Sequence, residues 1–349
     1  MQALHWDASR GSVKLVSLEK PQITKPDQLL IKVAYSGVCG TDLHVMKQEF
    51  PAAEKVVMGH EFTGTVENIG GEVTGFKIGD NVAVDPNSSC MKCAFCLKGQ
   101  PNYCPTGGGR SAIGMFQNGG WAEYCVVPVA QVFSLPADLS LATSALCEPM
   151  SCLQRGWDMI QPLLDDAKIL ITGAGMIGLL WASLLHHKGY RNITLSEPTD
   201  GRRKLAKNLG LNLKVLTPDI LATQYKDVDT AVHGFDLIMD CTGSPRAIEA
   251  IFPLLCRGAT LCTFGCCPSG SKANICPADI MMKELRIVGS LINPYTFIKA
   301  VPLVAAMGER YLDYEKLGVK VYSLDGFDDA FKDLKNGNIS KAMFKLNEN

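Results

Sequence analysis

No long, uninterrupted apolar stretch occurs in this sequence. A helix that spans a membrane needs roughly 18 or more consecutive apolar residues, and no segment of the 349-residue chain approaches that length without a charge. The first residues, MQALHWDASRGSVKLV, carry charges and lack the apolar core of about 7–15 residues that a secretory signal peptide contains. The sequence therefore predicts a cytoplasmic protein without a membrane span.

A strong charge imbalance is also missing. The chain contains 34 Lys and Arg residues against 35 Asp and Glu residues, and no basic run stands out. A protein that binds nucleic acid needs a basic patch to neutralise phosphates. A zinc-binding nucleic-acid module is therefore disfavoured, and a small-molecule substrate is expected. Because single hydrophobic cores stop growing at roughly 250–300 residues, this length predicts two domains.

Disulfide bonds are not expected, although the chain has 14 cysteines. In a reducing cytoplasm, closely spaced thiols bind metals more often than they form disulfides. Four thiolates fill a tetrahedral zinc and leave no position for a substrate, so the cluster Cys90, Cys93, Cys96 and Cys104 predicts a structural zinc that orders its loop. Most other cysteines lie in apolar or glycine-rich segments and are expected to be small buried side chains. These include Cys256, Cys262, Cys266 and Cys267.

Short β-branched runs separated by glycine turns fill the first part of the chain. Residues 28–84 contain LLIKVAYSG, GTVENIGGEV and FKIGDNVAV, and WAEYCVVP at 121–128 continues the pattern. Short strands of this kind predict a barrel-like antiparallel arrangement. A helix is expected from Ser140, with an interruption near Glu148 and Pro149.

A different pattern begins at Asp166. The apolar run AKILITG ends in glycine, as a buried parallel strand does, and a helical segment follows it. NITLSEP, FDLIMDCTG, ATLCTFG and LRIVGSL predict four more strands with helical segments between them. Alternating strands and helices form a parallel sheet covered on both faces. A helix over 295–308 and a last strand in AMFKLN are expected to pack back onto the first domain.

The segment ITGAGMIG contains the pattern Gly173-x-Gly175-x-x-Gly178 between a predicted strand and a predicted helix. This context is that of a dinucleotide-binding turn, in which the backbone approaches a pyrophosphate at the helix N-terminus. Glu197 ends the next predicted strand, where a carboxylate accepts hydrogen bonds from ribose and repels a 2′-phosphate. NAD is therefore favoured over NADP, although Arg202 could bind such a phosphate, as could the next residue, Arg203. A glycine turn without a ligand is the alternative.

Two motifs far apart in the sequence contain further metal-binding residue types. GVCGTDLH places Cys39, Thr41, Asp42 and His44 after a predicted strand, and GHEFTG places His60 and Glu61 before another. Cys, His and carboxylate side chains are zinc ligands, and ligands spread over the sequence are typical of a catalytic site with an open position. Taken singly, Cys39 could instead be a buried thiol, and His60 a hydrogen-bonded core histidine.

Together, these motifs resemble the zinc-dependent medium-chain dehydrogenase/reductase superfamily over essentially the whole chain. GVCGTDLH, GHEFTG, the four clustered cysteines, Glu148-Pro149 and AKILITGAGMIGLL carry the resemblance. It implies an α/β protein with a GroES-like β-barrel catalytic domain, residues 1–150 and 290–349. It also implies a Rossmann domain with a doubly wound parallel sheet, residues 151–289. Each subunit of a homodimer or homotetramer would bind one catalytic and one structural zinc.

The resemblance also assigns roles to individual residues. Cys39 and His60 match ligands of a catalytic zinc, and Glu61, Glu148 or a water completes its shell. Thr41 and His44 match the positions of a proton relay. The expected cofactor contacts are Gly173, Gly175, Met176, Ile177, Gly178, Glu197, Arg202, Thr242, Phe264, Gly265 and Leu291.

The implied activity is hydride transfer from a secondary alcohol to NAD. The carboxylates beside the predicted zinc ligands look more like polyol and threonine dehydrogenases than like simple alcohol dehydrogenases, so a polyol or sugar alcohol is the expected substrate. L-threonine and vicinal diols are the alternatives. A catalytically inactive zinc-binding relative is another, whereas a zinc-less quinone reductase relative would lack both GHE and the clustered cysteines.

One departure from the family concerns the substrate. Sorbitol dehydrogenases carry an Arg-Tyr pair where this chain has Ile292 and Asn293, which weakens the case for sorbitol itself. Asn293 is expected either to bind a substrate hydroxyl or to serve as a turn residue before Pro294.

Overall fold

The computed structural model describes residues 1–347, which form two compact units. The first, called the antiparallel unit, comprises Met1–Cys152, Ile292–Gly308 and the chain from Val319 onward. The second, called the parallel-sheet unit, comprises Leu153–Leu291 and Glu309–Gly318. The C-terminal part that the sequence places wholly in the first domain is thus interrupted by a short return to the second unit.

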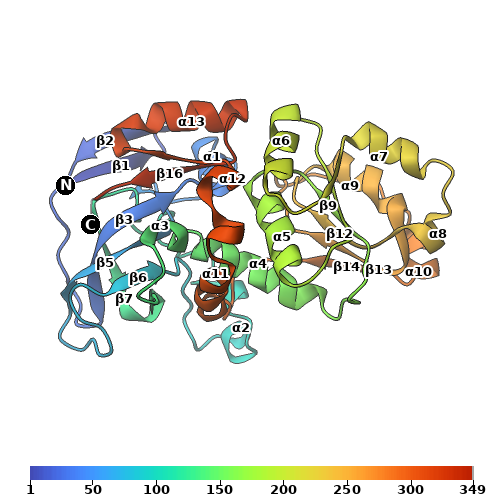
Figure 1. Ribbon diagram of the computed structural model, residues 1–349. Helices are drawn as coiled ribbons and strands as arrows, with labels where there is room; N and C mark the ends of the chain where they lie inside the picture. Colours follow the sequence, from blue (N-terminus) through green and yellow to red (C-terminus); the bar gives the residue numbers. More distant parts are fainter. Residues whose placement is uncertain (348–349) are drawn as a thin grey trace. The chain divides into compact units, whose positions relative to one another are not determined.

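The antiparallel unit is built on a seven-stranded and a three-stranded sheet (Figure 1). Its longest strand, β3 (Gln28–Gly37), is buried along most of its length and pairs antiparallel with β5 (Glu61–Ile69), β7 (Tyr124–Pro128) and β16 (Lys341–Lys345). The last strand of the chain therefore lies beside one of the first. The large sheet is completed by β6 (Asn81–Val84), β8 (Val132–Ser134) and β15 (Val319–Tyr322), and the small one consists of β1 (Gln2–Asp7), β2 (Ser12–Ser17) and β4 (Lys55–Val57).

The helix expected from Ser140 is interrupted earlier than predicted. The Ser140 hydroxyl accepts a hydrogen bond from the backbone N–H of Thr143 and caps α3 (Leu141–Ser144). The next helix, α4 (Cys147–Ile160), already contains Glu148 and Pro149 in its first turn. Proline is tolerated there because its missing N–H would have no helical partner. Glu148 is consequently fixed by a helix rather than by a break between helices.

Other helices of the antiparallel unit lie close to the predicted ligands or cover the sheet. In Figure 1, α13 runs above the strands of the small sheet. The long helix that the sequence places at 295–308 starts two residues later and bends at Gly308, where φ is 50°. The bounds are α1 (Gly40–Met46), α2 (Ala94–Leu97), α11 (Phe297–Leu312), α13 (Phe327–Asn336), and the short 3₁₀ turns Pro101–Tyr103, Val129–Gln131 and Leu324–Gly326.

Trp121 lies at the centre of the antiparallel core. Its side chain is fully buried, and the indole N–H donates to the Gly37 carbonyl at 3.0 Å. The ring also packs edge-on against Phe344 of β16 and contacts Phe331 of α13. One aromatic side chain thus joins the central strand, the last strand and the covering helix.

The parallel-sheet unit contains a six-stranded sheet with the order β11-β10-β9-β12-β13-β14. The five predicted strands are present, and β9 (Ile169–Thr172) and β10 (Ile193–Ser196) are buried throughout because helices cover both faces. In Figure 1, α5 packs on β9 and α9 on β12. The strand order reverses at β9, which is where α/β sheets bind ligands.

The remaining elements of this unit complete the alternation. The short strand β11 was not predicted, because three residues carry no readable periodicity. The strands are β11 (Lys214–Leu216), β12 (Phe235–Asp240), β13 (Leu255–Thr263) and β14 (Arg286–Gly289), and the helices are α5 (Met176–His187), α6 (Asp200–Asn208), α7 (Pro218–Tyr225), α8 (Thr230–His233), α9 (Pro245–Ile251), α10 (Pro277–Met282), α12 (Tyr314–Leu317) and the 3₁₀ turn Phe252–Leu254.

The expected burial of the scattered cysteines is partly wrong. Cys256 and Cys262 are buried within β13, but Cys267 is only half-buried and Cys266 is exposed, because both follow the end of that strand. Over residues 1–347, no helix combines the length and the apolar character that crossing a membrane requires.

Candidate catalytic metal and cofactor sites

Three of the predicted zinc ligands lie together in the antiparallel unit. Cys39 precedes α1, while His60 and Glu61 stand at the start of β5, where Glu61 pairs with Gly37 of β3. One ligand atom from each of Cys39, His60 and Glu61 lies within 4.8 Å of the other two. A thiolate, an imidazole and a carboxylate this close fit a catalytic zinc with an open fourth position.

Asp42 connects the two ligand-bearing stretches. It is fully buried; its Oδ2 accepts a hydrogen bond from the Cys39 N–H at 2.8 Å, and its Oδ1 lies 3.2 Å from His60 Nδ1. A carboxylate on Nδ1 leaves Nε2 for a metal and fixes the ring orientation. Burial disfavours the charged imidazole, but Asp42 and Cys39 outweigh it and hold the pKa of His60 well above its usual value. The raised pKa means that the imidazole holds a second proton in the absence of a metal, and a zinc ion bound at Nε2 would replace it.

Lys341 of β16 pairs with Glu61 inside the unit. Its Nζ forms an ion pair with Glu61 Oε2 and donates to the Val38 carbonyl at 3.1 Å, and both side chains are buried. Gly37 makes room for the pair, since a Cβ there would lie 2.3 Å from Glu61 Oε2 and 2.8 Å from Lys341 Cε. The ammonium group favours the ionised carboxylate, which is the form that binds a metal.

Glu148 is placed differently from Glu61. In the described chain it is not a member of the three-residue cluster, although it is buried on the first turn of α4. Its Oε1 accepts a weak hydrogen bond from Cys152 Sγ at 3.7 Å. Burial raises the pKa of Glu148 to about 8, and the negative charges of Glu61 and Asp85 act in the same direction. Of the two candidate carboxylates, the structure therefore places Glu61 with Cys39 and His60.

The predicted relay residues Thr41 and His44 are both on α1, three positions apart and hence on one face of the helix. His44 Nδ1 lies 2.5 Å from Glu49 Oε2, and the His44 ring stacks on Phe50 with centroids 4.7 Å apart. Gln48 adopts a φ of 60°, which turns the chain back so that Glu49 reaches the imidazole. When Nδ1–H donates to Glu49, Nε2 keeps its lone pair and can accept a proton.

The four clustered cysteines form a second candidate metal centre. The sulfurs of Cys90, Cys93, Cys96 and Cys104 all lie within 4.8 Å of one another. The Cys90 N–H points at Cys104 Sγ from 3.4 Å, and this hydrogen bond is the main cause that lowers the pKa of Cys104 to about 6. A thiolate is the form that binds zinc. Leu97 of α2 is 76% exposed, so little apolar packing orders this loop and a metal would do so instead.

The three glycines of the predicted cofactor turn meet three different requirements. Gly173 has a φ of 91°, a conformation that favours glycine. A Cβ on Gly178 would lie 1.9 Å from the Gly173 carbonyl oxygen, so only glycine allows α5 to pack this close to the turn. A Cβ on Gly175 would meet nothing within 4 Å. The surface is therefore open above the first residues of α5, Met176 and Ile177, where a pyrophosphate would bind the helix N-terminus.

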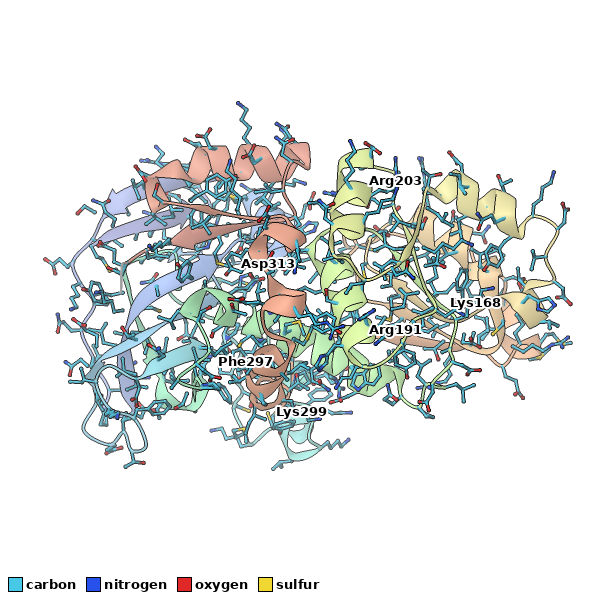
Figure 2. All side chains as sticks on the ribbon, viewed as in Figure 1. Lys168, Arg191, Arg203, Phe297, Lys299 and Asp313 are labelled. Atoms are coloured by element: carbon cyan, nitrogen blue, oxygen red, sulfur yellow. The ribbon has the colours of Figure 1, made fainter. Side chains whose placement is uncertain are left out.

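Glu197 follows β10 and is almost fully buried. Its Oε2 accepts a hydrogen bond from the Ala174 N–H of the glycine turn, and its Oε1 accepts one from the Thr199 N–H, each at 2.8 Å. Arg203, labelled on α6 in Figure 2, donates to the Glu197 carbonyl at 3.0 Å. Arg203 is thus engaged in shaping the turn, which leaves Arg202 as the candidate for a 2′-phosphate.

Three other predicted cofactor residues follow strands at the carboxyl edge of the parallel sheet. Thr242 follows β12 and donates to Asp240 Oδ1 at 2.6 Å, while Phe264 and Gly265 follow β13. A Cβ on Gly265 would lie 2.2 Å from the Gly243 N–H nitrogen, so the two loops are in close contact. Leu291 comes after β14, at the outer edge, and is 51% exposed.

Comparisons with known proteins agree with this arrangement. The alcohol dehydrogenase GroES-like domain family matches residues 25–137, and the zinc-binding dehydrogenase family matches residues 177–306. D-arabinitol dehydrogenase 1 of Uromyces fabae is 30% identical over 99% of this chain and 97% of its own length. D-altritol 5-dehydrogenase of Agrobacterium fabrum is 34% identical over 81% of this chain and 82% of its own.

A solved structure of a protein described as a zinc-binding dehydrogenase, from Sinorhizobium meliloti and bound to NADP, superposes with a TM-score of 0.89. It is 31% identical, and the match covers 99% of this chain and 98% of that one. These matches confirm the predicted fold class. The chain therefore belongs to the zinc-dependent medium-chain dehydrogenase/reductase superfamily, with a GroES-like unit and a Rossmann unit.

Proposed function

We propose that this protein oxidises a secondary alcohol of a polyol or sugar alcohol and transfers the hydride to NAD. The cluster of Cys39, His60 and Glu61, with Asp42 behind the imidazole, is the observation that carries the proposal. The similarity to D-arabinitol and D-altritol dehydrogenases supports a polyol as the substrate class.

In this proposal Cys39, His60 and Glu61 hold the catalytic zinc. When bound, zinc supplies a Lewis acid that makes the substrate hydroxyl more acidic, and the nicotinamide supplies the hydride acceptor. Asp42 keeps the His60 ring in place. Thr41 and His44 pass the hydroxyl proton outward, and Glu49 fixes the tautomer in which His44 Nε2 can accept it.

The second metal in this proposal is structural. Four thiolates would close the coordination shell of a zinc ion at the cysteine cluster and leave no position for substrate. The exposed loop around α2 depends on that ion for its order. The two sites therefore differ in what their loss affects: turnover at the Cys39 site, and stability or assembly at the cysteine cluster.

The choice of NAD over NADP rests on Glu197. Its carboxylate stands at the end of β10, beside the glycine turn, where the negative charge opposes a 2′-phosphate. Two observations favour NADP instead: the presence of Arg202 near the turn, and the NADP bound to the similar protein from Sinorhizobium meliloti. Titration with NADH and NADPH, followed by nicotinamide fluorescence, tests the preference, and a lower dissociation constant for NADPH would overturn it.

We further propose that the protein forms a homodimer or homotetramer in the cytoplasm. β14 is an edge strand of the parallel sheet, and Ile287 on it is 42% exposed. An open apolar edge is a surface on which a second copy can pair. The free thiols of the described chain suit a reducing compartment. Light scattering measures the subunit number, and a monomer at micromolar concentration would contradict this part.

A panel assay of polyols, vicinal diols and L-threonine with both cofactors tests the activity itself. Cys39→Ser and His60→Ala should lose at least about a hundredfold in kcat with the fold intact, because each removes a ligand of the catalytic metal. Cys276→Ser changes an exposed cysteine at the start of α10 and serves as the matched control with unchanged turnover. Full turnover by metal-free protein would refute the zinc mechanism.

A further inference from the structure

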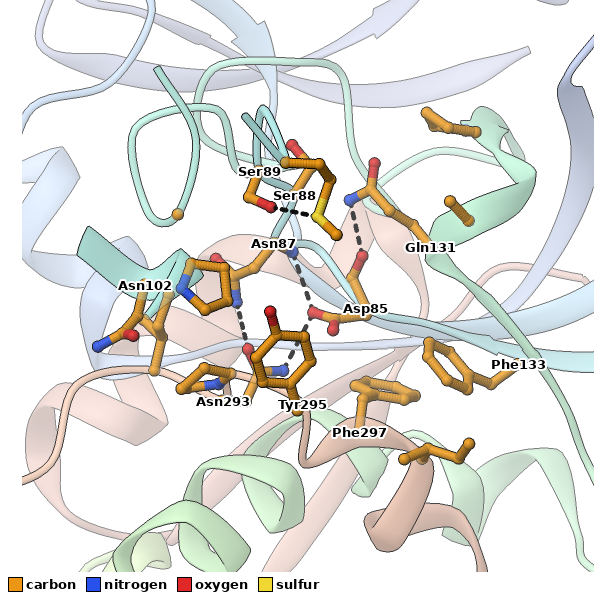
Figure 3. Close-up of a pocket in the computed structure, with 18 of the residues that line it drawn as sticks. Asp85, Asn87, Ser88, Ser89, Asn102, Gln131, Phe133, Asn293, Tyr295 and Phe297 are labelled. Atoms are coloured by element: carbon orange, nitrogen blue, oxygen red, sulfur yellow. Dashed lines mark hydrogen bonds between the residues drawn. The ribbon is translucent and has the colours of Figure 1, made fainter. Parts of the chain in front are cut away.

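A cavity of about 560 Å³ in the antiparallel unit lies over a buried network of polar side chains (Figure 3). Phe133 and Phe297 line its apolar side, with ring centroids 4.7 Å apart. Asp85 and Asn293 line the polar side. These two polar residues come from distant parts of the chain: Asp85 follows β6, and Asn293 lies where the chain re-enters this unit.

The Asn293 amide uses both of its ends within the protein. Its Nδ2 donates to Asp85 Oδ1 at 3.0 Å, and its Oδ1 accepts from Asn87 Nδ2 at 2.8 Å (Figure 3). The Nδ2 group also donates to Ser151 Oγ at 2.8 Å. Asn293 is only 2% exposed. Both N–H groups and one lone pair of Oδ1 are therefore engaged with three side chains, which favours a structural role for Asn293 over the contact to a substrate hydroxyl that was also expected.

The backbone on either side of Asn293 is strained. Ile292 has a φ of 48° and Tyr295 a φ of 59°, and neither is glycine. Positive φ is rare for a β-branched residue and persists only where surrounding contacts enforce it. The Thr296 hydroxyl adds such a contact by donating to the Ser151 carbonyl at 2.7 Å. The segment 292–296 is thus held against α4 from both ends.

The same network reaches the backbone of the helical turn that carries Glu148. The Ser151 hydroxyl that receives the Asn293 N–H donates in turn to the Glu148 carbonyl at 2.6 Å. At the other end, Asn293 follows the proposed cofactor contact Leu291 by two residues. Burial raises the pKa of Asp85 to about 6, while hydrogen bonds from Asn87 and Asn293 favour its ionised form.

We infer that Asn293 is a positioning residue that holds two parts of the proposed site through Asp85 and Ser151: the chain after Leu291 and the helical turn that carries Glu148. The inference rests on the proposed dehydrogenase function. In this role Asn293 does not recognise the distal hydroxyls of the substrate, and other residues must do so. Sorbitol dehydrogenases differ in carrying an Arg-Tyr pair at this position.

Exchanging the two partners provides the test. Asn293→Asp sets a carboxylate against that of Asp85, and Asp85→Asn removes the charge that Asn293 contacts. Hydrogen bonds to a buried charge are among the stronger ones, so each single variant should weaken NADH binding, and kcat/KM for the alcohol, by about 10- to 100-fold. The double variant restores the donor–acceptor pair between positions 85 and 293 but not the bond to Ser151 Oγ, so it should bind NADH and turn over the alcohol at least about fivefold better than the weaker single variant.

Two controls separate positioning from stability. Ser89 lines the same cavity, and its hydroxyl donates to Met91 Sδ at 3.1 Å and not to Asp85 or Asn293, so Ser89→Ala should change none of these values. Zinc content and Tm are measured for every variant. Amide hydrogen exchange should rise at 292–296 and at the start of α4 in the single variants, and should fall back toward the parent level at 292–296 in the double variant.

The outcomes are distinct. Single variants that lose Tm but keep NADH affinity and kcat/KM would show a merely structural role and overturn the inference, as would a double variant that does not recover. Absence of alcohol turnover in the parent would defeat the proposed function instead, and NADH affinity would still decide the role of Asn293. A parent that binds no NADH defeats the function and the inference together.

Discussion

Replacing Lys341 with methionine isolates the contribution of the buried ion pair at the candidate zinc site. The side chains of Lys341 and Glu61 are 4% and 2% exposed, so water cannot compensate the carboxylate when the ammonium group is lost. Removing one partner of a buried pair costs about 3–5 kcal/mol. The Val38 carbonyl also loses its donor, which adds about 1 kcal/mol.

This loss should depend on the metal. In metal-free protein, Lys341→Met leaves Glu61 as an unpaired buried anion, and the expected decrease of roughly 4–6 kcal/mol follows from the two terms above. With zinc bound beside Glu61, the metal supplies positive charge, so the decrease should be about half as large or less. Because a domain of this size loses about 2–4 °C in Tm per kcal/mol, the metal-free shift is on the order of 10 °C.

Calorimetry with and without a chelator measures both states. Glu61→Gln and the double variant complete a cycle in which Lys341→Met should cost little once the carboxylate is gone. Lys332→Met, at an exposed position on α13, is the control and should stay within about 0.5 kcal/mol. Additive effects of Lys341→Met and Glu61→Gln, within about 0.5 kcal/mol, would refute the assigned pairing.

Three further substitutions test other parts of the structure. Gly59→Ala should destabilise the protein by about 2–5 kcal/mol in urea unfolding, because φ is 93° and the new Cβ would lie 2.3 Å from a buried indole; Gly71→Ala, with open space around it, should be neutral. Cys104→Ser should halve the bound zinc and lower Tm, while kcat per folded molecule stays within about threefold, as a closed metal shell implies; a large loss of kcat with both zincs retained would contradict the structural assignment. Glu49→Gln should lower kcat about tenfold and change the ¹⁵N NMR tautomer signature of His44, and an unchanged tautomer would rule out the assigned orientation.

Local patterns predicted the parts of the sites whose residues are close in sequence. The spacing of Cys90, Cys93, Cys96 and Cys104 is short enough that any compact loop brings the sulfurs together. The glycine turn is equally local, since one turn and one helix start account for Gly173, Gly175 and Gly178. In both cases, the chemistry follows from chain geometry over a few residues.

Contacts between residues far apart in the sequence could not be predicted, because they depend on which strands pair. Lys341 meets Glu61 only because β16 pairs with β3, and no local signal marks that strand as the partner. Asp42 was named in the GVCGTDLH motif, but its contact with His60 was not predicted because His60 comes from another part of the sequence, at the start of β5. Asn293 had been weighed as a substrate contact because its three side-chain partners are invisible without the fold.

The position of β16 in the sheet also governs the order of assembly. The long continuous stretch of the parallel-sheet unit ends at Leu291, well before the last strand is synthesised, whereas the antiparallel unit has to wait for it. Pairing between strands at opposite ends of a chain is slow because a very long loop must close first. Until β16 arrives, the edge of β3 near Gly37 stays open to other strands. Before β16 pairs, the chain would thus contain Cys39, His60 and Glu61 without the lysine that pairs with Glu61, and the candidate zinc site gains its buried ion pair only when this strand is in place.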